Sequence, residues 1–348
     1  MTVTLLMERC MPGISLDEAI ELPWGLGTEF PEELFRVCQL IRSAKDEIVL
    51  DASGLQFIDP LGMATLRSLF EQLAFKSITM HFLSSALTSY LARMDFFKDL
   101  DIEGVDLSRI GNRHDRGASL FELTKVTEHR QAETVASKLA VALSGRLTHS
   151  DPNAPARDDT GRNEFDSYCG PIEYALKELL ENSLTHARRE GHGTAAVWVA
   201  CQFYPRKDLV RLAIVDNGCG FLATLRPHPE LVDKTHRGAI EAALRPRISC
   251  NRGAMAKVFG SENQGVGLTT TAKIAEFADG SVLVASGDAM HHTGTKTSTI
   301  IGGNIWDGVS VSFQCKRRRL PEVSIADLLP ADPANAVEQL DDDFLQFR

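Results

Sequence analysis

The sequence predicts an α/β protein with two domains. Its 348 residues are more than one hydrophobic core usually supports. Residues 48–94 alternate strand-like runs with helical runs, and residues 195–215 resemble a strand hairpin in their pattern. Such alternation builds layers of helices on sheets. We expect an N-terminal domain, a helical connector with a polar loop, a C-terminal domain, and a tail that is first basic and then acidic. Their expected bounds are residues 1–125, 126–165, 166–316 and 317–348.

The N-terminal domain is expected to contain two strands and two helices. Residues 48–51 and 78–83 are short apolar runs of the kind that form buried strands. Residues 61–75 carry apolar side chains at the three- and four-residue spacing of one helix face, and residues 86–94 are expected to form a second helix. Residues 52–59 form the loop before the first helix. The order indicates a small α/β layer.

The segment from Ile48 to Met63 reads Ile-Val-Leu-Asp-Ala-Ser-Gly-Leu-Gln-Phe-Ile-Asp-Pro-Leu-Gly-Met and resembles the STAS domain of anti-sigma-factor antagonists. Those domains usually place an aspartate, serines and a glycine at the head of a helix, and a partner kinase phosphorylates one serine. Asp59 and Gly62 match, but Pro60 and Leu61 occupy the serine positions. The resemblance therefore implies a docking or dimerisation module, with a protein partner or a homodimer, and no phosphorylation there.

Residues 126–147 are expected to form a helix between the domains. Their apolar residues Ala132, Val135, Leu139 and Leu143 make one stripe. This helix is a connector or a dimerisation helix. Residues 148–163 are polar and proline-containing, so they are expected to form a loop.

Glu178 and Asn182 lie in a run whose apolar spacing predicts a helix with Pro171 near its first turn. Because they are four residues apart, the two side chains share one helix face. An amide oxygen can bind a magnesium ion that carries phosphates, while a carboxylate orients a nucleophile. Taken alone, such a pair is more typical of an exposed polar helix face, so its context decides.

Asp216 is expected to end the hairpin formed by residues 195–203 and 209–215. Its carboxylate can accept a hydrogen bond from an adenine amino group, and Gly218 and Gly220 permit close approach to a flat ligand. The alternative is an ordinary Asp-Asn-Gly turn.

Gly265 and Gly267 precede a predicted helix over residues 269–277. The first amides of a helix have no partner within it, so phosphates can bind there. Simple helix capping is the alternative. Between these glycines and the hairpin, residues 222–262 form a long polar segment with one helical piece at residues 238–244.

These three segments in this order resemble the nucleotide-binding domain of the GHKL ATPases over residues 168–313. Within that family, their sequence is similar to that of the anti-sigma-factor serine kinases and related regulators. The resemblance implies a Bergerat-type α/β sandwich, in which helices cover a mostly antiparallel sheet. It implies ATP and Mg²⁺ as cofactors, Glu178 as general base, Asn182 as magnesium ligand and Asp216 as adenine acceptor. It also implies that four glycines shape the pocket and its lid, namely Gly218, Gly220, Gly265 and Gly267.

The implied function is a Mg²⁺-dependent ATP-binding regulatory protein with ATPase or serine/threonine kinase activity. The alternative is a nucleotide-gated scaffold with little turnover. Many relatives carry a Gly-Thr pair after the lid helix, near strands expected here at residues 281–286 and 309–313. The corresponding pair is Gly308-Val309, or Gly294-Thr295 in another alignment, so hydrolysis is expected to be slow.

Composition excludes several other classes. A net charge of −10 does not favour nucleic-acid binding. The seven cysteines are scattered without a Cys-x-x-Cys pair, which argues against a zinc site or a disulfide framework. No apolar run approaches the length of a membrane span, so a cytoplasmic protein without a membrane partner is expected.

Overall fold

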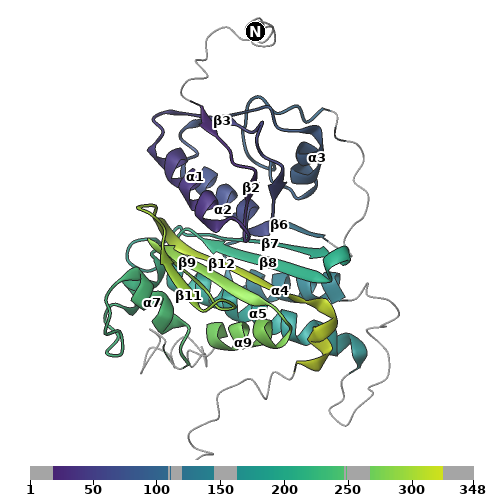
Figure 1. The fold of residues 1–348 in the computed structure, drawn as a ribbon, viewed down its shortest axis with the longest axis vertical. Helices are drawn as coiled ribbons and strands as arrows, with labels where there is room; N and C mark the ends of the chain where they lie inside the picture. Colours follow the sequence, from purple (N-terminus) through teal and green to yellow (C-terminus); the bar gives the residue numbers. More distant parts are fainter. Residues whose placement is uncertain are drawn as a thin grey trace, which may run out of the picture.

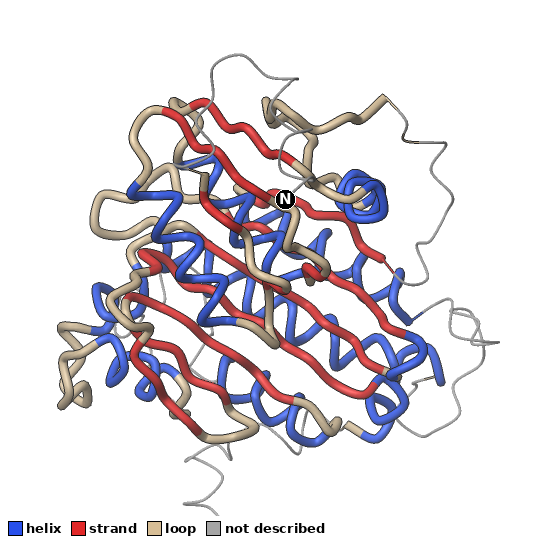
Figure 2. Tube along the Cα trace, turned by 45° about the horizontal axis from the view of Figure 1, so that its top comes forward, coloured by secondary structure: helices blue, strands red, loops and turns tan. Residues whose placement is uncertain are grey.

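A seven-stranded sheet crosses the middle of the protein, with the N-terminal unit on one face and helices on the other (Figure 1). We obtained this arrangement from a computed structural model, which describes residues 19–108, 110, 120–144, 163–246, 248 and 267–323. Figure 2 shows the strands lying side by side above the helical layer. We call residues 19–108 the N-terminal unit.

Every neighbouring pair in the large sheet is antiparallel, so the expected antiparallel sheet is confirmed. The spatial order is β11-β10-β9-β12-β8-β7-β6. The strands in chain order are β6 (Leu120–Val126), β7 (Val197–Tyr204), β8 (Leu209–Asp216), β9 (Ser281–Gly287), β10 (Ala289–His292), β11 (Thr297–Ile300) and β12 (Trp306–Lys316). Between β7 and β8, a short 3₁₀ turn (Pro205–Lys207) places Asp208 in the left-handed region, as expected for a tight hairpin turn.

Three helices cover the face of the sheet opposite the N-terminal unit: α4 (His129–Ser144), α5 (Glu164–Ala187) and α9 (Gly267–Phe277). Two shorter helices, α6 (Gly220–Leu225) and α7 (His236–Ala243), lie between β8 and α9 in the chain, and α7 packs on β9, β10 and β11. Among the helices in the described part of the chain, none is long and apolar enough to cross a membrane.

The starts of two helices, α5 and α4, differ most from those expected. Pro171 lies inside α5 and not in its first turn, because the helix begins at Glu164. Proline favours the first turn only as a tendency, and inside a helix it removes one backbone hydrogen bond. The helix expected from residue 126 starts at His129, because residues 120–126 form strand β6. The Gln131 side chain accepts hydrogen bonds from the backbone N–H groups of Thr127 and Glu128, which marks the helix start.

Strand β6 and helix α4 belong to the larger layer. β6 pairs with β7, and α4 packs against α5 with Ala132 and Leu139 buried. These two residues of the apolar stripe of α4 are therefore covered within the chain. The expected domain boundary at residue 125 falls inside β6.

Strand, helix, strand and helix follow one another in the expected order from β3 to α3, but the N-terminal unit also contains three short strands and a helix, α1, that were not expected. A small parallel sheet has the order β1-β3-β5, and a short pair joins β2 to β4. The strands are β1 (Ile20–Glu21), β2 (Gly25–Leu26), β3 (Glu47–Asp51), β4 (Phe57–Ile58) and β5 (Ser77–His81). The helices are α1 (Pro31–Ser43), α2 (Pro60–Gln72) and α3 (Ser85–Arg93).

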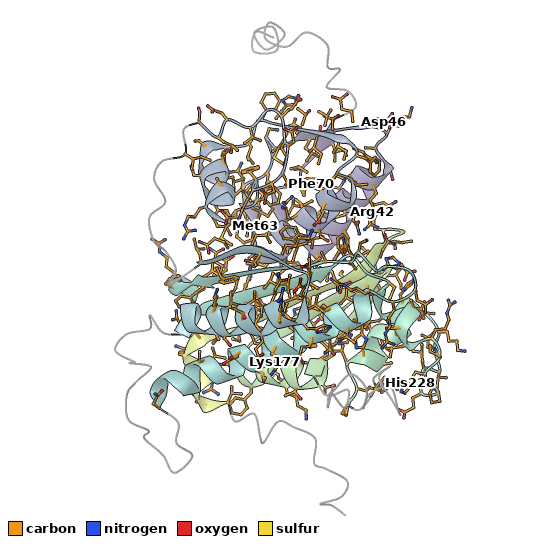
Figure 3. All side chains as sticks on the ribbon, turned by 180° about the vertical axis from the view of Figure 1, so that it is seen from behind. Arg42, Asp46, Met63, Phe70, Lys177 and His228 are labelled. Carbon is orange, nitrogen blue, oxygen red and sulfur yellow. The ribbon has the colours of Figure 1, made fainter. Side chains whose placement is uncertain are left out.

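Helix α2 joins the two layers by packing on β7, β8 and β12. All its residues from Pro60 to Phe70 are buried. Along β8, Leu212 and Ile214 pack toward the helices, whereas Ala213 and Val215 share a core with the N-terminal unit. Figure 3 shows Met63 and Arg42 at this boundary and Lys177 in the helical layer beyond it. Because both faces of the sheet are buried, the N-terminal unit and the sheet share one hydrophobic core.

A buried ion pair lies in the same interface. Asp59 is fully buried at the N-terminus of α2, where it accepts hydrogen bonds from the backbone N–H groups of Leu61 and Gly62. Its other oxygen accepts from the backbone of Thr28 at 2.9 Å and lies 3.2 Å from the Arg211 guanidinium on β8. The head of α2 is therefore enclosed between the layers.

We expect Arg211→Met to lower the free energy of unfolding by about 3–5 kcal/mol, because it leaves the buried Asp59 carboxylate without its cation. Denaturant unfolding of the full chain measures this loss. The control is Arg206→Met in the exposed hairpin turn, which should change stability by no more than about 0.5 kcal/mol. Equal unfolding midpoints for the two variants would show that the ion pair does not stabilise the interface.

The basic residues that follow β12 contact other parts of the fold. It forms a 3₁₀ helix, η4 (Arg317–Glu322), in which Arg317 lies 4.1 Å above the Phe203 ring. Arg318 pairs with Asp208, and Arg319 pairs with Asp279. The rest of the expected tail, residues 324–348, lies outside the described residues.

Candidate functional site

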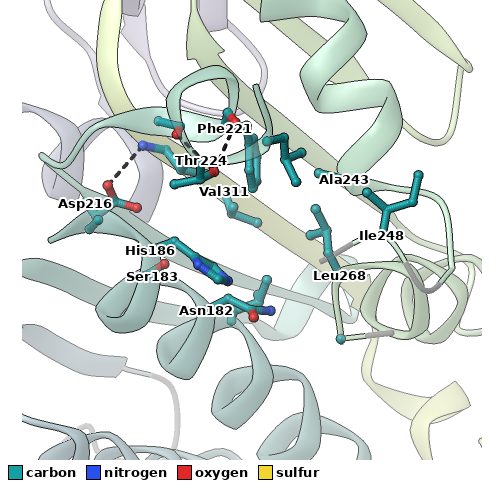
Figure 4. A pocket seen from close by; sticks show the side chains of 16 residues that line it. Asn182, Ser183, His186, Asp216, Phe221, Thr224, Ala243, Ile248, Leu268 and Val311 are labelled. Carbon is teal, nitrogen blue, oxygen red and sulfur yellow. Dashed lines mark hydrogen bonds between the residues drawn. The ribbon is translucent and has the colours of Figure 1, made fainter. Parts of the chain in front are cut away.

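A pocket opens between α5, α6, α9 and the beginning of β12 (Figure 4). The space between its walls is about 740 Å³, which includes open solvent. Its walls are largely apolar, with contributions from Leu179, Leu225, Ile248, Leu268 and Val311. A few polar groups enter this apolar surface, namely Asn182, Ser183, His186, Asp216 and Thr224.

Asp216 is the acidic side chain of the pocket. It ends β8 and is 1% exposed. Its Oδ1 accepts hydrogen bonds from the backbone N–H groups of Gly218 at 2.9 Å and Val309 at 3.2 Å. Within the part of the chain that the structure describes, Oδ2 has no hydrogen-bond partner, so it can accept one from a ligand.

Burial raises the pKa of Asp216 to about 7, although the two backbone hydrogen bonds oppose this rise. The carboxyl group therefore titrates near neutral pH. A ligand that donates a hydrogen bond to it favours the ionised form.

The two glycines after Asp216 shape the loop for different reasons. A Cβ on Gly218 would lie 2.3 Å from the Cα of Ala187, so only glycine lets the loop contact the end of α5. Gly220 has φ of +73°, a backbone conformation that residues other than glycine rarely adopt, and it is the first residue of α6. Both glycines therefore let the loop pack closely against other parts of the chain, and their close approach to a flat ligand stays a prediction.

Helix α5 contributes Asn182, Ser183 and His186 to the pocket (Figure 4). Burial, with a smaller contribution from Arg189, lowers the pKa of His186 to about 4, so His186 is neutral near pH 7. The backbone of Glu178 lies one turn before Asn182 on the same helix. The Glu178 side chain lies outside what the structure describes.

The N-terminus of α9 meets the pocket through Gly267 and Leu268. The first backbone amides of a helix have no partner within it, so they can donate to a ligand there. Gly265 lies outside the described residues. The pocket thus brings together Asn182, Asp216, Gly220 and Gly267, with Gly218 directly behind Asp216.

Sequence reasoning missed α6, which adds Phe221 and Thr224 to the pocket. A helix of six residues that starts at a glycine is too short to show a helical period in the sequence. It also left two positions open for the pair that corresponds to the Gly-Thr pair of many relatives. Gly308-Val309 lies beside Asp216, whereas Thr295 bonds to His292 in the turn between β10 and β11. Val309 offers a backbone N–H at the site but no hydroxyl.

Residues 170–302 match the family model of the histidine kinase-, DNA gyrase B- and HSP90-like ATPases. The matched stretch includes Asn182, Asp216 and the start of α9. The chain therefore contains a GHKL-type ATPase domain over these residues, and this class of domain binds ATP. No curated protein and no solved structure matched the chain.

Proposed function

We propose that this protein binds ATP together with Mg²⁺ in the pocket and acts as an ATPase or a serine/threonine protein kinase in regulation. The observation that carries the proposal is Asp216 Oδ2, which has no hydrogen-bond partner among the described residues and lies in a pocket that the N-terminus of α9 also meets. A carboxylate suits an adenine amino donor, and helix amides suit phosphates. The apolar walls between them suit a flat base.

Asn182 is the residue that we assign to magnesium. It faces the pocket on α5, and its amide oxygen is a hard ligand of the kind that Mg²⁺ prefers. One protein oxygen is enough for a fit, because Mg²⁺ usually completes its octahedron with phosphate oxygens and water. When bound, the ion supplies charge stabilisation for the phosphates. Glu178, one turn away, is assigned as the general base that orients an attacking hydroxyl or water.

If the protein is a kinase, we assign the phosphoryl acceptor to another protein. Thr65 and Ser68, on α2, are fully buried between the layers. Helix α2 packs on the face of the sheet opposite α5 and α9, whereas the pocket lies among those helices. An acceptor on α2 therefore cannot reach the pocket in the folded chain. This supports docking of a separate partner, with the N-terminal unit as docking or dimerisation module.

A nucleotide-gated scaffold is the second candidate, and Val309 favours it. The position beside Asp216 that carries threonine in many GHKL relatives has no hydroxyl here. Binding without turnover can still change the population of a protein conformation, provided that ATP binds one state better than another.

We expect ATP binding near neutral pH to release protons from Asp216. Its pKa of about 7 means that about half of the nucleotide-free molecules are protonated at pH 7, and adenine favours the ionised form. Affinity should therefore rise between about pH 6 and about pH 8 and then level off. Calorimetry in buffers of different ionisation enthalpy measures the release, and excess Mg²⁺ keeps the triphosphate ionised. Proton uptake, or no transfer, would contradict the assignment of Asp216.

A further inference from the structure

We propose that helix α1 of the N-terminal unit positions the nucleotide pocket through Arg42, which binds the segment of β12 next to Asp216. This inference rests on the proposed function, because it assigns a regulatory contact to the same site. Neither Arg42 nor its partner Asp307 lines the pocket. Arg42 is therefore a positioning residue.

The contact is made at an irregularity in β12. In its pairing with β9, Trp306 faces Gly287 and Val309 faces Ser286, so Asp307 and Gly308 are extra residues in β12. Such bulges bend a strand, redirect its backbone groups and are common beside functional sites. We call residues 306–309 the β12 bulge.

The β12 bulge forms the wall of the pocket around Asp216. The backbone N–H of Val309 donates to Asp216 Oδ1 at 3.2 Å. A Cβ on Gly308 would lie 2.0 Å from the Asp216 carbonyl oxygen, so the two backbones are in direct contact. The carbonyl oxygen of Gly308 accepts from the Ser286 hydroxyl at 2.9 Å, and that hydroxyl accepts from the backbone of Phe221 in the pocket. Moving the bulge therefore moves both Asp216 and α6.

Helix α1 contacts this bulge from the other side. Arg42 Nη1 donates to Asp307 Oδ2 at 2.7 Å and to the Ile305 carbonyl oxygen at 3.1 Å. The Arg42 guanidinium also lies 5.1 Å from the centre of the Trp306 ring. Trp306 is fully buried and packs against Phe35 of α1 at 6.2 Å between ring centres. Residues 305–307, which lead into Gly308, thus all contact α1.

The chain of contacts gives the N-terminal unit a short route to the pocket. It runs from Arg42 to Asp307, and then through Gly308 and Val309 to Asp216. Coupling between two binding events is reciprocal, so a partner that shifts α1 should change ATP affinity, and ATP should strengthen the contact of α1 with the bulge.

The test compares ATP affinity in four variants of the full chain: Arg42→Met, Asp307→Asn, their double variant, and Arg36→Met. Arg36 is a matched control, because it lies on α1 and pairs with Glu33 on the surface. We expect Arg42→Met and Asp307→Asn each to weaken ATP binding by about 2- to 30-fold. The double variant should be no weaker than the poorer single variant, since both remove one contact. Arg36→Met should bind like the wild type.

A second measurement separates this inference from the proposed function. Amide hydrogen exchange of the nucleotide-free protein should show faster exchange at Val309 and Gly218 in Arg42→Met than in Arg36→Met, because both amides donate to Asp216 Oδ1. Faster exchange in a chain that binds no ATP would support the contact and contradict the proposed function. ATP binding by the wild type, with both affinity and exchange unchanged in Arg42→Met, would overturn the inference.

Discussion

Asp216→Asn is expected to weaken ATP binding about 100-fold or more while leaving the fold intact. Asparagine can keep the Oδ1 acceptor for Gly218 and Val309, but it places an NH₂ donor where Oδ2 now lies. That donor would oppose the adenine amino group, and losing a hydrogen bond to a charged group costs about 1.5–3 kcal/mol before the added repulsion. Calorimetric titration with ATP measures the change in affinity.

The same variant should be more stable than the wild type without nucleotide. The pKa of Asp216 is raised above its ordinary value, so its contribution to stability is present below about pH 4 and is lost as pH rises through about 7. Asparagine does not ionise, so the gain should reach about 1–4 kcal/mol at about pH 8. Asp208→Asn, at the other end of the hairpin, is the control and should bind ATP normally. Normal ATP binding by Asp216→Asn would remove Asp216 from the adenine site.

Glu178→Gln is expected to reduce phosphoryl transfer by about 10²- to 10⁴-fold and to spare ATP binding, because a general base acts in the chemical step. The assay follows a labelled γ-phosphate as free phosphate or on protein, with candidate partners present. Glu173→Gln is a matched control on α5, where Glu173 accepts a hydrogen bond from Ser137 of α4 and lies outside the pocket lining. ATP binding without any turnover that depends on Glu178 would favour the nucleotide-gated scaffold.

The local sequence pattern was sufficient to predict the helices and strands that have a strong apolar periodicity. The hairpin of β7 and β8 follows from two apolar runs around a turn, and Asp216 ends the second of them. The pattern did not predict β10 (Ala289–His292) and β11 (Thr297–Ile300), because these strands are short and largely polar. Such strands form because antiparallel pairing satisfies their backbone groups: β10 pairs with β9 on one side and with β11 on the other.

The role of the N-terminal unit also depended on contacts between distant parts of the chain. Leu209–Asp216 is nearly continuous in apolar residues, which indicates a strand buried on both faces. The sequence does not say which segment covers the second face, and Arg211 in the middle of the strand looks exposed when considered alone. Its partner is Asp59, 152 positions away in the chain. In the same way, Gly308-Val309 could be distinguished from Gly294-Thr295 only by its contact with Asp216.

The most direct test of the central claim is a calorimetric titration of the full chain with ATP and with GTP, each with excess Mg²⁺. We expect saturable ATP binding and much weaker GTP binding, because guanine presents a carbonyl oxygen where adenine presents its amino group, and that oxygen would face the Asp216 carboxylate. Absence of ATP binding, or equal affinity for the two nucleotides, would contradict an adenine site at Asp216.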